Sequence, residues 1–286
     1  MRKLLISALA VAAFVAATVS CSDSFTLADH IGMCGEKNGV VAKDCGMDYV
    51  EVSVSRFLAP EKDEERFLEN LAFAADSLPP LYAANGFFPK DIKLTGPEAD
   101  LPRAIAYGKT AIQRASKAGI EILVLGSGAA RTIPEEFPCE EAQNQFVSLL
   151  DSLAEEASAY GIVIAIEPLQ SKETNFINTV SEGAAIARLT GRENVAVIAD
   201  FYHMAAEGEG PEAIIANADK LVHCHVAEPE KRTAPGVQGT DFTPYFKALR
   251  QIGYKGRISI ECRWSDIRSE LPVALETLKD QIKASK

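Results

Sequence analysis

Four apolar runs in the second half of the chain each lead into a side chain that can bind a metal ion or move a proton. The runs cover residues 161–166, 195–199, 221–224 and 257–260, and they lead into Glu167, Asp200, His225 and Glu261. Apolar runs without polar alternation are typical of strands buried on both faces, as in a parallel sheet covered by helices. Pro168 cannot extend a strand ladder beyond Glu167. We therefore expect each of the four side chains at the carboxyl end of its strand.

The four residue types suit one divalent cation. Three carboxylates and one imidazole bind hard or borderline ions, so we expect Mn²⁺, with Mg²⁺, Co²⁺ or Zn²⁺ as alternatives. Neighbouring strands lie ~4.8 Å apart, so adjacent strand ends on a curved wall can converge on a single ion. The alternative is that each polar residue only ends its own strand, and the fourfold repetition of the pattern argues against it.

The elements that must position these residues form a regular series. Further candidate strands occupy residues 25–28, 49–54, 81–84 and 122–125. A candidate helix follows each of the eight strands: a short one that ends near Cys45, and longer ones at 63–76, 101–118, 139–160, 180–190, 211–218, 242–252 and 267–284. Alternating strands and helices favour a parallel sheet. Eight such units, with no glycine-rich phosphate fingerprint after the first strand, predict one (β/α)₈ TIM barrel over residues 25–286 rather than a doubly wound sheet.

The charge of the chain limits its partners. The formal net charge is −11, with only 29 Lys and Arg residues. A nucleic-acid surface needs a basic face, so we expect no nucleic acid as a partner. The loops after the four strands carry neither a basic cluster nor a glycine-rich phosphate cradle, which favours an unphosphorylated small substrate. A homo-oligomer is compatible with the sequence.

The first 24 residues have the pattern of an export signal. Arg2 and Lys3 precede an apolar stretch over residues 4–17, and small residues lead to Cys21. This pattern predicts a signal peptide over residues 1–20, and it resembles a bacterial lipoprotein signal in which Cys21 is lipidated. Residues 21–24 would form a short tether. The chain would be exported to the periplasm or outer membrane and would touch the membrane only through its lipid. An ordinary signal peptide is the alternative.

Six cysteines occur in the sequence. Cys34 and Cys45 could form a disulfide in an oxidising compartment. Cys224 and Cys262 fall in predicted strands, where small buried hydrophobic residues are expected. The sequence contains no Cys-x-x-Cys, so a zinc ribbon is unsupported.

From about residue 25 to its end, the chain resembles the xylose isomerase-like barrel superfamily of sugar isomerases and epimerases. The branches it resembles most are the ketose 3-epimerases and hydroxypyruvate isomerases. Four motifs carry the resemblance, in order along the chain: Glu167-Pro-Leu with Glu173-Thr-Asn-Phe, Asp200-Phe-Tyr-His203-Met, His223-Cys-His225-Val-Ala-Glu228 with Arg232, and Ile260-Glu261.

The resemblance implies a role for each matching position. Glu167, Asp200, His225 and Glu261 would hold the metal, and Glu167 and Glu261 would also move the substrate proton. Glu173, His203 and a basic residue after His225 would bind sugar hydroxyls. In the epimerases this basic residue is an arginine six positions after the histidine. That position is Lys231 here, and Arg232 follows it.

Other side chains are weaker candidates. His223 shares a strand face with His225, so it could contact substrate or be a satisfied interior histidine. Glu228 is expected to orient Arg232 or the substrate. Arg131 is expected to be a solvated loop residue, and His30 could line the rim. Three aromatic residues could form an apolar wall against a sugar, although packing is the expected role of such residues: Phe87, Phe88 and Trp264.

The prediction for function is a metal-dependent isomerase or epimerase that acts on an unphosphorylated keto-sugar through an enediolate. Two glutamates would serve as acid and base. A lyase or hydrolase of a 3-keto-glycoside would use the same residues. A catalytically degenerate sugar-binding lipoprotein is a third possibility. The superfamily also contains DNA-repair endonucleases, but their three-metal site needs more than the four histidines of this chain.

Overall fold

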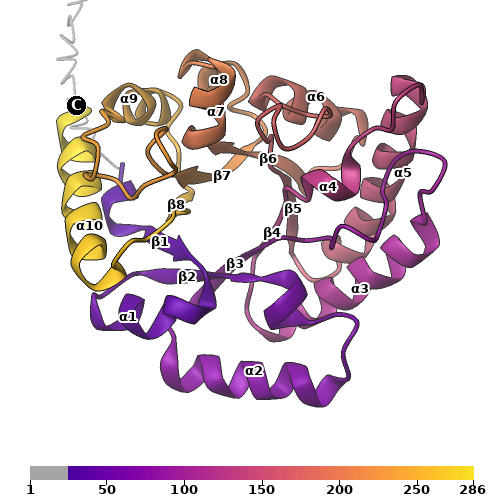
Figure 1. Cartoon of the computed structure of the whole chain (residues 1–286), viewed down its shortest axis with the longest axis horizontal. Coiled ribbons are helices and arrows are strands. Elements are labelled where there is room, and N and C mark those ends of the chain that lie inside the picture. Colours follow the sequence, from indigo (N-terminus) through magenta and orange to yellow (C-terminus); the bar gives the residue numbers. More distant parts are fainter. Residues whose placement is uncertain (1–24) are drawn as a thin grey trace, which may run out of the picture.

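The computed structural model describes residues 25–286, which form a closed barrel of eight parallel strands in sequence order (Figure 1). The strand that closes the barrel, β8, pairs with β1, with Ile31 opposite Ile258. This confirms the predicted (β/α)₈ barrel. The strands are β1 Ile31–Cys34, β2 Tyr49–Ser53, β3 Leu81–Asn85, β4 Ile122–Leu125, β5 Val163–Ile166, β6 Val195–Asp200, β7 Leu221–Val226 and β8 Arg257–Ile260.

Helices surround the ring of strands (Figure 1). The longest are α2 Glu64–Ser77, α3 Leu101–Lys117, α5 Cys139–Ser158 and α10 Ile267–Ala284. Shorter helices are α1 Gly39–Asp44, α4 Gly128–Arg131, α6 Val180–Leu189, α7 Phe201–Glu207, α8 Glu212–Ala216 and α9 Thr243–Gln251. No helix of residues 25–286 is long and apolar enough to cross a membrane. The predicted signal peptide, Cys21 and the tether lie outside the described residues.

Side chains alternate between the two faces of each strand, and this alternation sets the position of every site residue. On β2, Val50 and Val52 pack outward against the helices, whereas Tyr49 belongs to a separate cluster inside the barrel. Glu51 is two residues after Tyr49 on the same strand, so its side chain also points into the barrel. The same rule on β7 sends Cys224 and Val226 outward, and His223 and His225 inward.

Several sequence-based expectations were wrong. Residues 25–28 are not a strand, because Leu27–Asp29 is a 3₁₀ turn and Leu27 is buried in the outer core. The first strand begins instead at Ile31. A short helix, α7, directly follows Asp200 and was not expected. Cys34 and Cys45 are both free thiols, so the predicted disulfide is absent from the described residues. Cys224 is buried as expected, whereas Cys262 lies beyond the end of β8 and is only partly buried.

Candidate active site

Four side chains from the ends of β5, β6, β7 and β8 meet in one cluster. Glu167, Asp200, His225 and Glu261 each offer a ligand atom, and these atoms all lie within 4.8 Å of one another. Register explains the meeting, because Asp200 is directly opposite His225 in the sheet. Glu167 and Glu261 immediately follow β5 and β8. The structure therefore brings together the four residues that the sequence singled out.

Carboxylates surround the imidazole of His225. Its Nδ1 lies 3.1 Å from Glu167 Oε1 and 3.2 Å from Glu261 Oε2. Burial and the charge of Glu261 raise the pKa of Glu167. Burial would also raise the pKa of Glu261, but the charges of His225 and Arg232 outweigh it and lower this pKa. Burial would lower the pKa of His225, but nearby acidic groups including Glu51 outweigh it and raise the pKa. The cluster thus stabilises positive charge at its centre.

The donor set fits a divalent cation. Asp200 is 2% exposed, and its Oδ2 has no hydrogen-bond partner among the residues that the structure describes. A buried carboxylate oxygen without a donor is costly, and a cation beside it removes the cost. Three carboxylates and one imidazole nitrogen are ligands suited to Mn²⁺, Mg²⁺, Co²⁺ or Zn²⁺.

His203, on α7, is oriented as a hydrogen-bond donor. The backbone N–H of Gln170 donates to its Nδ1 over 3.1 Å, so the ring hydrogen is on Nε2. This Nε2 is buried, has no hydrogen-bond partner within residues 25–286, and lies 3.6 Å from Asp200 Oδ2. Its N–H is free to reach a ligand oxygen. The short helix that follows Asp200 is therefore what carries this donor to the cluster.

Arg232, not Lys231, is the basic residue at the cluster. Its Nη2 contacts Glu261 Oε2 and lies 3.5 Å from Asp200 Oδ2, while its Nε donates to the Glu261 carbonyl over 3.0 Å. The guanidinium also lies over the Tyr202 ring, 4.7 Å from its centre. The Lys231 side chain is 77% exposed and pairs only with Glu230 among the described residues. Of the two basic residues that the sequence left open, the structure places Arg232 and not Lys231 beside the cavity.

Glu228 shapes the loop that carries Arg232, and it does not line the cavity. It is fully buried, and its carboxylate accepts the Thr233 hydroxyl and a group of backbone N–H donors. These donors are the amides of Gly236, Gln238, Gly239 and Thr240. The carboxylate thereby folds the segment after β7 around itself, and it makes no hydrogen bond or ion pair with the Arg232 side chain.

His223 lies beneath the cluster and does not line the cavity, which agrees with the expected alternative of an interior histidine and not with a contact to substrate. It is fully buried, and its Nε2 is 3.1 Å from Glu51 Oε2. Sequence reasoning missed Glu51, which lies on β2 and is also fully buried. Burial would raise the pKa of Glu51, but the charge of His225 and hydrogen bonds from both histidines outweigh it and lower the pKa. The sequence feature that could have identified Glu51 is its position two residues after Tyr49, which puts both side chains on the same face of a largely apolar strand.

Arg131, on α4, is fully buried, so the expectation of a solvated loop residue was wrong. Burial lowers its pKa to about 10, and it remains charged at neutral pH. It donates only to backbone carbonyls, and these lie at the ends of β4 and β5 and in the segment after β5: Leu125, Gly126, Glu167, Phe176 and Ile177. Arg131 therefore fixes the backbone that presents Glu167.

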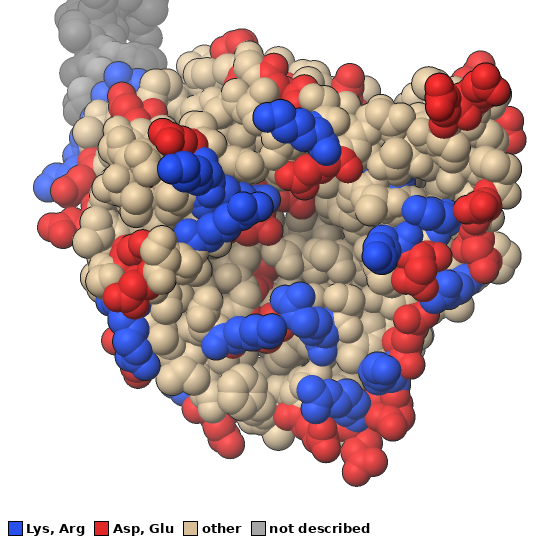
Figure 2. Space-filling view, viewed as in Figure 1, with Lys and Arg blue, Asp and Glu red and all other residues tan. Residues whose placement is uncertain are grey.

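A cavity of about 220 Å³ opens above the cluster. Figure 2 shows a hollow in this face, with acidic atoms inside it and Lys and Arg at its edge. Among the predicted substrate-binding residues, Glu173, His203 and Arg232 line the cavity, whereas His223, Glu228 and Lys231 do not. Its full lining is Asn85, Gly86, Gly126, Ser127, Gly128, Glu167, Leu169, Glu173, His203, Arg232 and Glu261.

The other candidates lie away from the cavity. Phe87 and Phe88 are buried and stacked on each other with ring centres 4.6 Å apart, so they are packing residues. Trp264 packs against the outer core. His30 precedes β1 and pairs with Asp48 over 3.4 Å. It therefore lies at the amino end of the barrel, opposite the cluster, which contradicts a position at the rim.

Comparison with known proteins shows that the chain is similar to proteins named as sugar epimerases. The chain is 36% identical over 122 residues to an L-ribulose 3-epimerase of Methylomonas sp., a match covering 42% of each chain. It is 34% identical over 121 residues to a 3-dehydro-D-guloside 4-epimerase of Escherichia coli, covering 42% of this chain and 45% of that protein. The chain thus spans less than half of the length of these relatives.

Among solved structures, the fold is similar to that of the IOLI protein with a bound zinc atom. The TM-score is 0.68 at 19% identity, covering 90% of this chain and 97% of that one. The model of the xylose isomerase-like TIM barrel family matches residues 40–284, which include β2 to β8 and all four residues of the cluster. This chain belongs to the xylose isomerase-like TIM barrel family.

Proposed function

We propose that this protein is an isomerase or epimerase of an unphosphorylated keto-sugar or sugar derivative, dependent on one divalent metal ion. The observation that carries the proposal is the pair Glu167 and Glu261. Both carboxylates line the same cavity, and both converge on His225 Nδ1. Two carboxylates at one substrate cavity are what proton transfer at a carbon beside a carbonyl requires.

Glu167, Asp200, His225 and Glu261 would hold the metal. When bound, a divalent cation supplies the positive charge that stabilises the negative oxygens of an enediolate. The zinc atom in the related IOLI structure supports a metal in this fold. We retain Mn²⁺ as the expected ion, with Mg²⁺, Co²⁺ and Zn²⁺ as alternatives, since the donor set suits each of them.

The proton would move between the substrate and the two glutamates. One carboxylate takes the proton from the carbon beside the carbonyl, and the other returns a proton to the opposite face, which inverts that centre. Arg232 holds Glu261 in place through its Nη2 and Nε. The free Nε2–H of His203 and the carboxylate of Glu173 would bind sugar hydroxyls, since both line the cavity.

The cavity favours a neutral sugar. The lining has three acidic side chains and one arginine, and this arginine already contacts Glu261 and Asp200. A phosphate group would meet net negative charge there. This agrees with the proposal that the chain is exported and lipid-anchored at Cys21, in a compartment where sugars are usually unphosphorylated. The names of the two relatives support ketoses and 3-keto-glycosides as the substrate classes to test.

Solvent exchange tests the proposal directly. The full 286-residue chain would be incubated with Mn²⁺ in D₂O with a panel of ketoses and 3-keto-glycosides and followed by NMR. We expect deuterium at the carbon beside the carbonyl, together with a new stereoisomer or a moved carbonyl. Deuterium exchange with release of an aglycone would instead identify the lyase that the relative acting on a 3-dehydro-guloside makes plausible.

A variant separates catalysis from binding alone. Glu261→Gln keeps the size of the side chain but removes the charge, so it should abolish exchange while sugar still binds. If neither the wild type nor the variant exchanges any proton and both bind sugar, the protein is a binding module and the enzyme proposal is wrong.

A further inference from the structure

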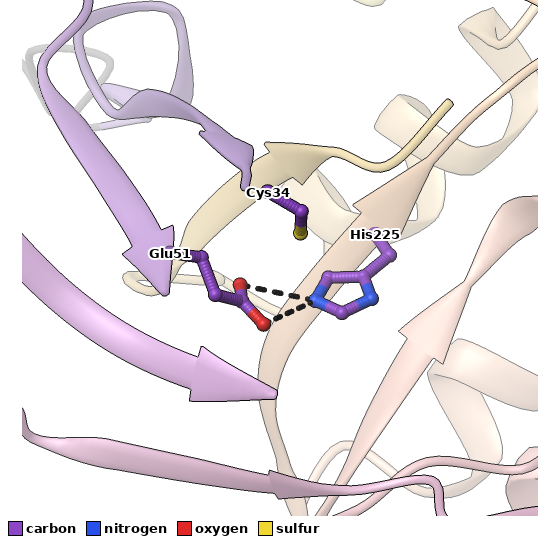
Figure 3. Close-up of side chains that lie close together, drawn as sticks. All are labelled: Cys34, Glu51 and His225. Carbon is purple, nitrogen blue, oxygen red and sulfur yellow. Dashed lines mark hydrogen bonds and ion pairs between the residues drawn. The ribbon is translucent and has the colours of Figure 1, made fainter. Parts of the chain in front are cut away.

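A second group of polar side chains lies one layer below the cavity. Figure 3 shows Cys34 from β1, Glu51 from β2 and His225 from β7, with both Glu51 oxygens directed at one nitrogen of the His225 ring. His225 Nε2 is 3.2 Å from Glu51 Oε1 and 3.1 Å from Oε2. The opposite ring nitrogen, Nδ1, faces Glu167 and Glu261. His225 therefore links the buried layer to the candidate metal ligands.

Three donors converge on the Glu51 carboxylate. Besides His225 Nε2, its Oε2 meets His223 Nε2 at 3.1 Å and accepts the Ser259 hydroxyl over 2.8 Å. Tyr49 extends this series of hydrogen bonds, with its hydroxyl 2.9 Å from Ser259 Oγ. All five residues of this hydrogen-bonded group are fully buried: Tyr49, Glu51, His223, His225 and Ser259. Water therefore has little access, and the atoms around the Glu51 carboxylate must satisfy one another, whereas His223 Nδ1 has no hydrogen-bond partner within residues 25–286.

A carboxylate only accepts hydrogen bonds, so the facing nitrogens must carry hydrogens. The Nε2 atoms of His223 and His225 are then both protonated. The Nδ1 atom of His225 also faces carboxylates, those of Glu167 and Glu261. A metal ion held by Glu167, Asp200 and Glu261 would take the place of the hydrogen on Nδ1, while Nε2 would keep the hydrogen that it donates to Glu51. Metal-binding histidines generally donate their other ring N–H to a carboxylate or carbonyl, which fixes the tautomer and the ring orientation.

We propose that Glu51 is the positioning residue of the metal centre: it holds His225 as the Nε2–H tautomer, so that Nδ1 faces Glu167, Asp200 and Glu261. The inference rests on the proposed function, because it assumes that these four residues bind a metal. Ser259 and Tyr49 anchor Glu51 from below.

Cys34, Glu51 and His225 could instead form a second metal site, since their ligand atoms also lie within 4.8 Å of one another. The hydrogen bonds argue against that. Both oxygens of Glu51 already accept hydrogens, and His225 Nε2 supplies one of them. A cation there would displace the His225 Nε2 hydrogen from Glu51, so support of the upper site is the better use of this group.

Metal affinity tests the proposal without relying on activity. Glu51→Gln preserves size, but an amide has one acceptor oxygen and one donor nitrogen, so it cannot accept from all three donors. We expect the affinity of the full chain for Mn²⁺ and Zn²⁺, measured by competition with a chelator, to fall about 10–100-fold. Tyr254→Phe is the matched control, because it removes a buried hydroxyl that donates to the Arg257 carbonyl and makes no hydrogen bond to Glu51 or His225, and its affinity should equal that of the wild type.

A measurement on the wild type keeps the proposal falsifiable if Glu51→Gln does not fold. The chain has four histidines, so ¹⁵N NMR of the zinc-loaded protein can distinguish their ring nitrogens. We expect a protonated Nε2 and a zinc-bound Nδ1 for His225. Zinc on Nε2 with a proton on Nδ1 would overturn the proposal, as would wild-type affinity in Glu51→Gln.

Three further outcomes distinguish a failure of the metal centre from a failure of the role of Glu51. If the wild type binds no divalent ion, the metal centre of the proposed function fails, and this inference fails with it. If the wild type binds metal but Glu51→Gln binds it equally well, only the role of Glu51 is wrong. A cobalt–thiolate absorption band that disappears in Cys34→Ser would place the ion in the lower group and would also overturn the proposal.

Discussion

The two halves of the barrel contribute different chemistry to the cavity. Strands β5 to β8 end in Glu167, Asp200, His225 and Glu261. Strands β3 and β4 lead instead into neutral and mostly small residues that line the opposite wall, namely Asn85, Gly86, Gly126, Ser127 and Gly128. One half gathers the ionisable groups, and the other half leaves space beside them.

The carboxylate of Glu167 in the charged half can occupy its position only because small residues form the neutral wall. A Cβ atom on Gly126 would lie 2.3 Å from Glu167 Oε2, so any side chain there would displace that carboxylate. A Cβ on Gly128 would lie 3.1 Å from the Glu173 carbonyl oxygen. The comparison shows that the position of a catalytic carboxylate can depend on a glycine on a neighbouring strand. Substitutions in each half can test this division.

The largest effect is expected for Glu167→Gln in the charged half. The amide cannot take or return a proton, and general acid–base catalysis contributes ~10²–10⁴-fold, so turnover should fall by about 10³-fold. Exchange of solvent deuterium into substrate measures the loss. Sugar binding, followed by calorimetry, should persist. Wild-type turnover in this variant would show that Glu167 does not move the substrate proton.

Gly126→Ala tests the neutral half. The nearest obstacle is the mobile end of the Glu167 side chain, so the protein should fold with the carboxylate displaced. A misplacement of about 1 Å can cost roughly 10²-fold in rate, which is the expected loss.

The control for Gly126→Ala is Gly108→Ala in α3. Its Cβ would lie 2.5 Å from Leu153 in the outer core, far from the site. This control should lower the unfolding midpoint and leave specific activity intact. Equal activity losses in the two variants would mean that the small residues of the neutral wall have no special role.

Arg131→Met tests the buried clamp between the two halves. The variant leaves several buried carbonyl oxygens without their donor, at ~1–3 kcal/mol each, so the free energy of unfolding should fall by more than about 3 kcal/mol. Arg103→Met is the control. Its partners Glu61 and Asp91 are exposed, and an exposed ion pair contributes at most about 1 kcal/mol. Chemical denaturation measures both, and equal losses would contradict the clamp.

The smallest effect is expected at the rim of the charged half. Lys231→Ala should leave turnover unchanged because the Lys231 side chain extends into solvent. The neighbouring substitution Arg232→Ala should lower turnover, since it removes the donors that hold Glu261. Steady-state kinetics on both variants checks the assignment. A loss for Lys231→Ala equal to that for Arg232→Ala would restore Lys231 as a substrate contact.

The sequence alone determined the barrel and the four residues of the cluster. Strands buried on both faces appear as uninterrupted apolar runs, and a polar residue at the end of such a run stands out. The parallel order of the strands then places these ends at one rim. These are local signals that repeat along the chain, which is why β5 to β8 could be found with the residues they present.

Only the tertiary structure decided which polar residues serve the cavity. Glu51 lies in the middle of β2, and its partners His223, His225 and Ser259 come from strands at the other end of the sequence. Barrel closure brings them together. Likewise, Arg131 and Glu228 are charged loop residues by sequence, yet both are fully buried, because backbone groups distant along the chain satisfy them. Contacts of this kind depend on the path of the whole chain, and local sequence patterns do not encode that path.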